Sequence, residues 1–202
     1  MSHQHRTICY DCHRPSTSCM CPYISPLETN TRFIILMHPK EFKKTKNGTG
    51  HFTNLSLKNC EIHIGVDFSQ NKIINEIIEN PSNVCYVLYP SETSINLNTS
   101  VVGNNGKNTI LFLIDSTWPC SRSILLHSPN IQKLEKVSFT HTKVSIFTFK
   151  QQPKEYCLST MESTLCVLEL LTKHKIENLE RQNLDGFLLP FKKMVEYQLS
   201  CE

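Results

Sequence analysis

The fold of this chain is decided by the stretch Thr109-Ile-Leu-Phe-Leu-Ile-Asp115-Ser-Thr-Trp118-Pro-Cys-Ser-Arg-Ser123. Residues 110–114 are apolar without a break, which is typical of a strand buried on both faces of a parallel sheet. The run stops at Asp115, and Pro119 then fits the first turn of a helix, where its missing N–H costs nothing. The stretch therefore predicts a carboxylate at the carboxyl end of a buried strand, which is where open α/β sheets bind ligands.

Asp115 allows two interpretations at this stage. It belongs to a ligand site, or else Asp115 or Ser116 caps the following helix by accepting hydrogen bonds from its first N–H groups. A motif of this length does not separate the two interpretations, so both are kept.

The length and composition predict one main domain and a protein without a membrane span. The chain has 202 residues, of which 39% are hydrophobic and 19% charged, and its net charge is +3. Domains commonly contain about 100 to 200 residues, and no apolar run approaches the roughly 18 residues that a membrane helix needs. The first ten residues lack the apolar core of a secretory signal, so the predicted location is cytoplasmic.

Four of the ten cysteines form the pattern C-x2-C-x6-C-x-C near the N-terminus. Two close pairs separated by a short loop let thiolates converge on a tetrahedral zinc ion, and so short a segment would scarcely fold otherwise. The zinc is expected to be structural, because four thiolates leave no open position. A nearby histidine could replace one sulfur, and the other six cysteines are interpreted as reduced thiols. The predicted ligands are Cys9, Cys12, Cys19 and Cys21, and the nearby histidines are His3, His5 and His13.

Hydrophobic periodicity predicts an alternation of strands and helices after a linker at residues 22–30, and therefore an α/β fold. Strands are expected at residues 32–38, 61–66, 84–89, 110–114, 136–139 and 144–149. Helical segments are expected at residues 54–57, 71–80, 119–126, 159–174 and 184–199. Ser159 and Glu162 form a capping box for the helix predicted at 159–174. Pro190 bends the last helix or marks its true start.

Residues 38–51 are predicted to form a polar and basic loop after the first strand. Its glycines do not follow the G-x-x-x-x-G-K-[ST] spacing of a P-loop, so ATP hydrolysis is not supported. Such a loop contacts a phosphate backbone while an aromatic ring stacks on a base, or it is simply a solvated lysine-rich loop. The residues concerned are Lys40, Lys43, Lys44 and Lys46, together with Phe42 and His51.

Short motifs follow one another along nearly the full length of the chain. They are the four-cysteine cluster, His38-Pro39-x-Glu41 with Thr49-Gly50, Leu88-Tyr89-Pro90, Asp115-Ser-Thr117-Trp118, Arg122 with Ile124, and Ser159-Thr160-x-Glu162. In this order they resemble the DTW-domain family, the tRNA-uridine aminocarboxypropyltransferases, whose fold is related to that of the knotted SPOUT methyltransferases. The chain departs from the family pattern at Ser116 and Ser121, where smaller nonpolar residues are common, and at residues 46–50, which are one residue longer than in some relatives.

The resemblance implies a fold, an activity and a partner. The fold is α/β and SPOUT-like, with a knotted, mostly parallel sheet flanked by helices at residues 31–202, preceded by the zinc module and linker at 1–30. The activity is transfer of the 3-amino-3-carboxypropyl group from S-adenosylmethionine to N3 of a uridine, with release of methylthioadenosine. The implied substrate is tRNA, with rRNA as the open alternative. The protein then has to orient the reacting carbon and help to remove the N3 proton. Monomer and homodimer are both compatible with the sequence.

The same resemblance assigns roles to individual residues. Asp115 is the implied base, or it holds the ammonium group of the cofactor instead. Two other functions stay open, namely a SPOUT-type RNA methyltransferase and a zinc-dependent RNA-binding factor without catalysis. The implied cofactor-binding residues are Leu88, Tyr89, Pro90, Asp115, Ser116, Thr117, Trp118, Ser159, Thr160 and Glu162. The implied RNA-binding residues are Lys40, Lys43, Lys44, Lys46 and Arg122.

Overall fold

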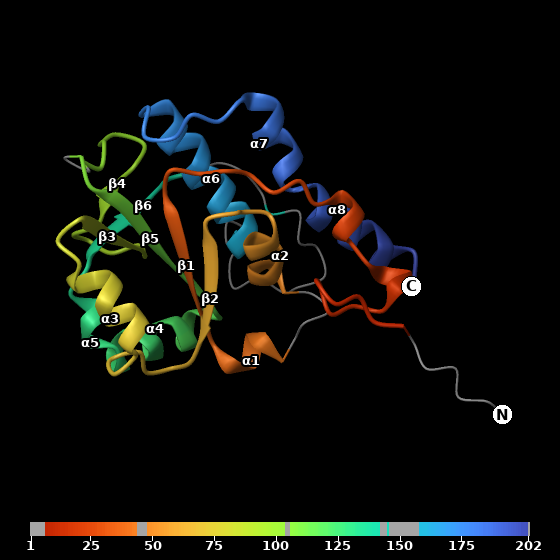
Figure 1. Cartoon of the computed structure of the whole chain (residues 1–202), viewed down its shortest axis with the longest axis horizontal. Helices are drawn as coiled ribbons and strands as arrows, with labels where there is room; N and C mark the ends of the chain where they lie inside the picture. The colour runs from red at the N-terminus through yellow and green to blue at the C-terminus, as the bar shows by residue number, and fades with distance from the viewer. Residues whose placement is uncertain (1–6, 44–47, 104–105, 142–144, 146–157, 202) are drawn as a thin grey trace.

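The computed structural model of the chain describes residues 7–43, 48–103, 106–141, 145 and 158–201. Strands and helices alternate through most of these residues, which confirms the predicted α/β fold (Figure 1). The strands are β1 (Arg32–Met37), β2 (Cys60–Ile64), β3 (Asn83–Leu88), β4 (Ile95–Asn96), β5 (Asn108–Asp115) and β6 (Glu135–Ser138). The helices are α1 (Pro39–Phe42), α2 (Thr49–Leu55), α3 (Lys72–Glu79), α4 (Trp118–His127), α5 (Pro129–Gln132), α6 (Thr160–Lys173), α7 (Arg181–Phe187) and α8 (Leu189–Leu199).

The described strands form one parallel sheet in the order β2-β1-β5-β3-β6-β4. The strand predicted from the apolar run is β5, which pairs with β1 on one side and β3 on the other. Phe112 in its middle is fully buried, as that prediction requires. Because all these strands run in the same direction, the chain segments that follow β1, β3, β5 and β6 leave the sheet at one edge, which we call the carboxyl edge.

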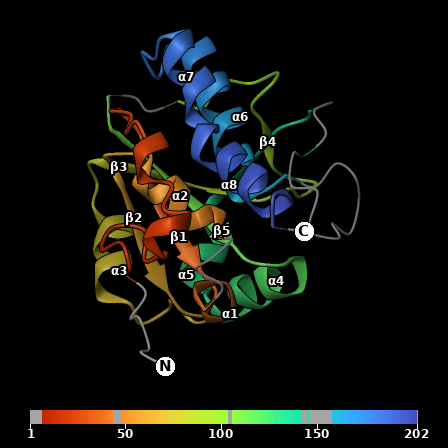
Figure 2. The same ribbon diagram turned by 90° about the vertical axis from the view of Figure 1, so that its right-hand side faces the viewer.

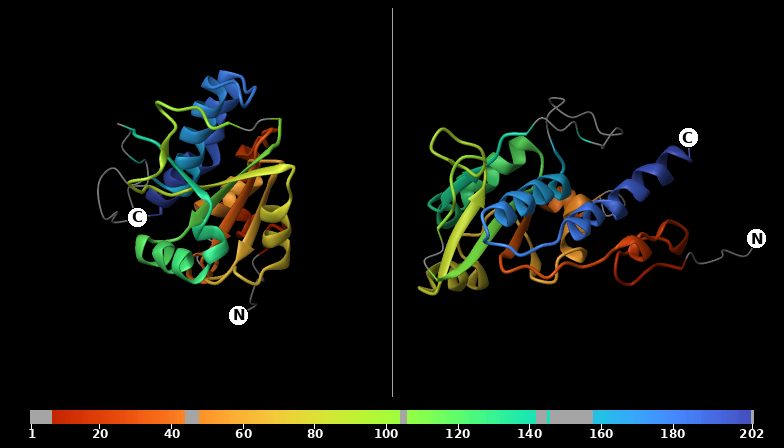
Figure 3. Two further views of the ribbon diagram at one scale, coloured as in Figure 1. Left: turned by 90° about the vertical axis from the view of Figure 1, so that its left-hand side faces the viewer. Right: turned by 90° about the horizontal axis from the view of Figure 1, so that it is seen from above.

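Helices cover both faces of the sheet (Figures 1 and 3). The strand side chains alternate between two hydrophobic cores, one on each face. On one face, Phe112 packs with apolar side chains of α3, α4 and α5. On the other face, Leu111 and Leu113 pack with side chains of α2, α6, α7 and α8. Asp115 continues this second series by the two-residue period of a strand, so its side chain is directed toward α2 and α6.

Residues 7–30 pack against the second face and share its core (Figure 2). Met20 and Leu27 belong to the same buried cluster as the sheet residues. The backbone of Leu27 hydrogen-bonds to that of Ser56 and of Lys58, just after α2. A short 3-10 turn, η2 (Cys21–Tyr23), contacts α8. The cysteine segment is therefore attached to the body of the protein through α2 and α8.

The sequence-based elements differ from the structure mainly between β1 and β2. The bare loop predicted over residues 38–51 is wrong, because α1 and the start of α2 lie within it. His38 caps α1 by accepting a hydrogen bond from the N–H of Lys40 through Nδ1, and Pro39 supplies the first turn. The short helix α5 was not expected. The single helix predicted at 184–199 is wrong, because α7 ends at Phe187 and α8 begins at Leu189. Pro190 lies in the first turn of α8, so it marks a helix start and not a bend. The strand predicted at 144–149 falls outside the described residues, apart from Ser145.

Among the described residues, no helix is both long enough and apolar enough to cross a membrane.

Candidate active site

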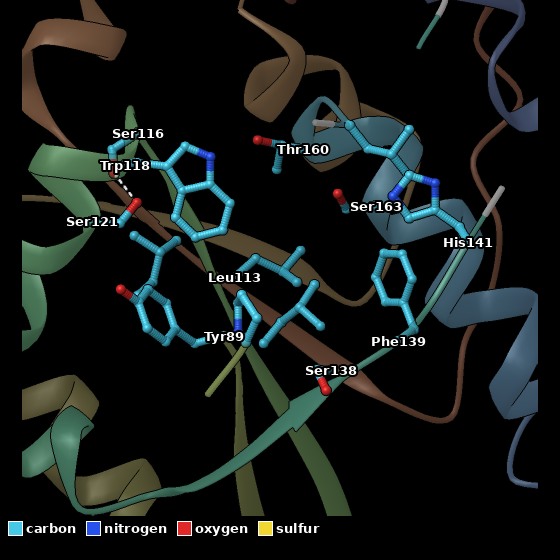
Figure 4. Close-up of a pocket in the computed structure, with 14 residues that line it drawn as sticks. Tyr89, Leu113, Ser116, Trp118, Ser121, Ser138, Phe139, His141, Thr160 and Ser163 are labelled. Atoms are coloured by element: carbon cyan, nitrogen blue, oxygen red, sulfur yellow. Dashed lines mark hydrogen bonds between the residues drawn. The ribbon is translucent and has the colours of Figure 1, made fainter. Parts of the chain in front are cut away.

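A cavity of about 400 Å³ opens at the carboxyl edge of the sheet, beside the ends of β3, β5 and β6. Helices α4 and α6 contribute its remaining walls (Figure 4). Its volume lies within the range of about 300 to 1,000 Å³ that is usual for small-molecule sites. The lining residues are Leu88, Tyr89, Pro90, Leu113, Ile114, Ser116, Trp118, Ser121, Ser138, Phe139, His141, Leu158, Thr160 and Ser163.

Aromatic rings form two opposite walls of the cavity (Figure 4). On one wall, the indole of Trp118 is 46% exposed and packs edge-on against the ring of Tyr89, with the ring centroids 6.2 Å apart. On the other wall, the rings of Phe139 and His141 form a tilted pair at 5.7 Å. Aromatic faces attract cations and stack on nucleobases. These walls therefore suit a ligand that carries a flat base and a positive charge.

Hydroxyl groups gather on the two helices that border the cavity. At the start of α4, the hydroxyl oxygens of Ser116 and Ser121 are 2.8 Å apart. Thr160 and Ser163 reach the cavity from the first turn of α6 (Figure 4). The cavity is thus apolar and aromatic over most of its surface, with hydroxyl groups at defined positions.

The start of α6 is fixed by the capping box that the sequence predicts. The Ser159 hydroxyl accepts a hydrogen bond from the N–H of Glu162 at 3.3 Å, and the Glu162 carboxylate accepts the N–H of Ser159 at 2.8 Å. The same carboxylate accepts the hydroxyl of Ser145 at 2.8 Å. These bonds hold the first turn of α6, and with it Thr160, at the cavity wall.

Asp115 lies behind the cavity wall and does not line the cavity. Its side chain is 7% exposed, and its carboxylate accepts a hydrogen bond from the Thr160 hydroxyl at 2.5 Å. Its backbone carbonyl accepts the N–H of His38 at 3.1 Å. The N-cap of α4 is Thr117, without a side-chain cap, so the interpretation of Asp115 or Ser116 as the cap of that helix is wrong.

Gly50, in the first turn of α2, lies against the same carboxylate. A Cβ atom at this position would be 2.3 Å from Oδ2 of Asp115 and 2.9 Å from Cε of Met37. Both distances are shorter than non-bonded carbon and oxygen atoms allow. Only glycine therefore leaves room for the carboxylate between α2 and α6.

The four N-terminal cysteines come together as the sequence predicts. Their sulfur atoms all lie within 4.8 Å of one another, and the pairs Cys9–Cys21 and Cys12–Cys19 are each 3.7 Å apart. Four sulfurs at about 2.3 Å from a tetrahedral zinc ion would be roughly 3.8 Å apart, so the donor set fits zinc. Backbone N–H groups of Cys12 and Asp11 lower the pKa of Cys9 to about 7, whereas burial raises the pKa of Cys19 and of Cys21. Of these three cysteines, Cys9 alone therefore favours the thiolate that a metal binds.

Arg14 connects this cysteine cluster to α2. Its side chain is 4% exposed, and its guanidinium lies 4.3 Å above the ring centroid of Phe52. Burial lowers the pKa of Arg14, whereas the charges of the nearby thiolates of Cys12, Cys19 and Cys21 raise it. A buried guanidinium is thus placed where it offsets the negative charge of a four-thiolate site.

The sequence is similar to known proteins over nearly its whole length. The family model described as "DTW domain" matches residues 6–199, which is nearly the whole chain. The chain belongs to the DTW domain family. Among its relatives are proteins named tRNA-uridine aminocarboxypropyltransferase 2. The Drosophila melanogaster protein is 30% identical, and the match covers 96% of this chain and 76% of the relative. The Mus musculus protein is 26% identical, and the match covers 97% of this chain and 65% of the relative. The Macaca fascicularis protein of the same name is 26% identical over 96% of this chain.

This DTW domain spans 65% of the length of the Mus musculus protein and 64% of that of the Macaca fascicularis protein. No solved structure matches it significantly.

The structure of this DTW domain separates the implied cofactor-binding residues into two groups. Six of them line the cavity, and these are Leu88, Tyr89, Pro90, Ser116, Trp118 and Thr160. The other four do not line it: Asp115, Ser159 and Glu162 lie behind the wall and hold Thr160 in place, and Thr117 is the exposed N-cap of α4. The residues of the second group therefore do not touch a ligand bound in the cavity, and they can affect it only by positioning the residues that do.

Several lining residues were missed by the sequence analysis, and only some left a signal. Ser163 lies one helical turn after Thr160 in the predicted helix, so the helical period could have identified it. Ser138 and Phe139 end a predicted strand, which is where a ligand site was expected. Nothing in the sequence distinguishes His141, because it lies in an irregular segment after β6. The remaining missed residues are Leu113, Ile114, Ser121 and Leu158.

The implied RNA-binding residues lie at the carboxyl edge, as far as the structure describes them. Lys40 and Lys43 are exposed on and just after α1, and Arg122 is exposed on α4. These helices follow the neighbouring strands β1 and β5, and they lie near each other in Figure 2. Lys44 and Lys46 fall outside the described residues. The described cations are thus placed at the same edge as the cavity.

We propose that the four cysteines hold a structural zinc ion, and we expect its removal to weaken binding of RNA more than binding of S-adenosylmethionine. The cysteine cluster lies outside the cavity lining, and a segment held by four thiolates unfolds when its metal is removed. We expect Cys12→Ser, or chelation, to raise the Kd for tRNA by about 10-fold or more and that for S-adenosylmethionine by less than about 3-fold. The matched control is Cys201→Ser, an exposed cysteine outside the cluster. Elemental analysis without one zinc per chain in freshly purified protein would contradict the prediction.

Proposed function

We propose that this protein transfers the 3-amino-3-carboxypropyl group from S-adenosylmethionine to N3 of a uridine in tRNA and releases methylthioadenosine. The observation that carries the proposal is the cavity at the carboxyl edge, to which three motifs of the family contribute lining residues. They are Leu88-Tyr89-Pro90, the Asp115–Trp118 segment and the start of α6. The names of the relatives support the same activity.

The chemistry of the cavity fits the proposed donor. Tyr89, Trp118 and Phe139 offer faces for an adenine ring and for a sulfonium cation. The hydroxyls of Ser116, Ser121 and Ser163 offer partners for a ribose and for the amino and carboxylate groups. The N-terminus of α6 has the polarity that favours a carboxylate.

The protein's task in this reaction is mainly to position the reactants. The bond to the sulfonium is already activated, so the walls have to present one of three carbons to the attacking nitrogen and to keep water away. We infer that the half-exposed Trp118 and its neighbour Tyr89 form the side of the cavity that the target base approaches. A knotted, SPOUT-like chain path belongs to the same proposal, as the family resemblance implies.

The decisive experiment is mass spectrometry of nucleosides from unmodified tRNA, and separately from rRNA, after incubation with the protein and S-adenosylmethionine. We expect a uridine that has gained the aminocarboxypropyl group, together with methylthioadenosine. Formation of S-adenosylhomocysteine and a methylated nucleoside would instead identify a methyltransferase. Absence of both products and of donor binding would identify a zinc-dependent RNA-binding factor.

Binding of tRNA should depend on the cations of α1. Each phosphate contact that is lost lowers the slope of log affinity against log salt concentration by about 0.7 to 0.9. For the pair Lys40→Ala with Lys43→Ala we therefore expect a slope reduced by roughly 1.4 to 1.8 if both residues contact phosphates. The matched control is Lys107→Ala with Lys173→Ala, two exposed lysines, before β5 and at the end of α6, away from the carboxyl edge. An unchanged slope for the first pair would show that α1 carries only solvated lysines.

A further inference from the structure

We propose that Thr160 and Asp115 form a proton relay, in which Thr160 is the catalytic residue that contacts the uridine and Asp115 is the group that finally receives the proton. The inference rests on the proposed transfer to uridine N3. It makes Thr160 more than a cofactor contact, and it explains how a carboxylate that does not line the cavity can act on a substrate bound there.

The direction of the hydrogen bond between the two residues carries the argument. The Thr160 hydroxyl has one proton, and it donates that proton in a hydrogen bond to Oδ1 of Asp115 at 2.5 Å. A hydroxyl whose proton is engaged in this way presents only its lone pairs to other partners. Because Thr160 also lines the cavity, it faces a bound ligand as a hydrogen-bond acceptor. An acceptor is what the N3–H group of a uridine requires.

Both ends of the relay are held by rigid elements. Asp115 ends the central strand β5, and its carboxylate lies between Gly50 of α2 and the first turn of α6. Thr160 is held by the capping box of Ser159 and Glu162. A proton-transfer pair fixed in this way needs little rearrangement at the moment of reaction.

The proposed step conserves protons and electrons. The N3 proton moves to Oγ1 of Thr160 as the hydroxyl proton of Thr160 moves to Oδ1 of Asp115. The N3 electron pair forms the new bond to the aminocarboxypropyl carbon, and the electron pair of the breaking carbon–sulfur bond goes to the sulfonium, which becomes the neutral sulfur of methylthioadenosine. Asp115 later returns its proton to water through Thr160.

Other titratable side chains surround the pair and provide the rival explanation. Among the described residues they are His141 and Tyr89 across the cavity, Glu162 on α6 and His38 before α1. Glu162 is engaged in the capping box, and Nδ1 of His38 accepts the N–H of Lys40. His141 is therefore the main alternative as the group that takes the N3 proton.

The test is the pH dependence of the single-turnover transfer rate at saturating S-adenosylmethionine and tRNA. Thr160→Val removes the hydroxyl and keeps the shape of the side chain, and Thr160→Ser restores the hydroxyl. We expect Thr160→Val to lose about 100-fold or more near neutral pH and Thr160→Ser to stay within about 3-fold of wild type. As alkaline pH removes the N3 proton without a base, the Thr160→Val rate should rise about 10-fold per pH unit toward the wild-type rate.

Two comparison variants make the outcome specific. Ser163→Ala removes a hydroxyl from the same cavity wall and the same face of α6, and any loss it causes should be constant with pH. His141→Gln should likewise show no recovery at alkaline pH. Recovery for His141→Gln together with a constant loss for Thr160→Val would overturn the relay in favour of the histidine.

Folding and the proposed function are checked separately. Thermal melting and the donor Kd show whether Thr160→Val is folded. If that variant does not fold, Asp115→Asn is measured in the same pH series. The amide oxygen of the introduced asparagine would still accept the Thr160 hydroxyl, but it cannot take the proton. A constant loss for that variant would also overturn the relay. Wild-type protein that forms no modified uridine would overturn the proposed transfer itself, and the relay with it.

Discussion

Asp115→Asn should lower the single-turnover transfer rate by about 100-fold to 10,000-fold, the usual contribution of a positioned proton acceptor. Asparagine keeps the size of the side chain and an oxygen that can accept the Thr160 hydroxyl, whose bond to Asp115 is 2.5 Å long. It removes the negative charge and the capacity to take a proton. Affinities for S-adenosylmethionine and tRNA should stay within about 3-fold of wild type, because the carboxylate does not line the cavity.

The same measurements separate the remaining roles of Asp115. If the carboxylate holds the ammonium group of the donor, the Kd for S-adenosylmethionine rises together with the loss in rate. The matched control is Asp185→Asn, an exposed carboxylate on α7 that should change neither quantity. Near-normal turnover of Asp115→Asn would remove this residue from the mechanism.

Gly50→Ala should disturb the same carboxylate from the opposite side. The added methyl would be 2.3 Å from Oδ2 of Asp115, so either the carboxylate or α2 has to move. We expect a loss of about 1 to 3 kcal/mol in the free energy of unfolding, the usual cost of overpacking. The transfer rate should fall by roughly 100-fold, because a displaced carboxylate loses its aligned bond to Thr160.

The control for this change is Gly186→Ala, which places the same methyl in helix α7 with no atom within 4 Å. Alanine is favoured over glycine in a helix by roughly 0.5 to 1 kcal/mol, so this variant should be as stable as wild type or slightly more stable. Denaturant unfolding and single-turnover rates measured for both variants test the prediction. If Gly50→Ala kept wild-type stability and rate, the close approach of α2 to Asp115 would contribute neither to stability nor to the transfer reaction.

The sequence predicts most strands and the longer helices well, because the residue patterns that identify them lie within each element. An unbroken apolar run identifies β5, and a capping box identifies the start of α6. Pro190 was compatible with either a bend or a helix start, and the structure shows the start of α8 there. The helices α1 and α2 were less predictable, because they are short and because α1 is capped by a histidine, which is not a common cap residue.

The candidate site was predictable in its residues but not in their arrangement. The two-residue period of β5 places Asp115 on the same face as Leu111 and Leu113, but the period does not reveal which helices cover that face. Direct contact of Asp115 with a ligand was therefore a reasonable expectation from its position at the strand end. Its placement behind Thr160 depends on packing between β5, α2 and α6, which are far apart in the sequence.

The packing of Arg14 on Phe52 has a consequence for how the protein can be divided and engineered. Phe52 follows Gly50 by two residues in the same short helix, and Met20 and Leu27 continue the hydrophobic core from the N-terminal side. A chain shortened to begin at residue 31 would lose these partners and expose the apolar side chains they cover. The N-terminal segment therefore cannot be exchanged for another module without removing part of the support behind the Asp115 carboxylate.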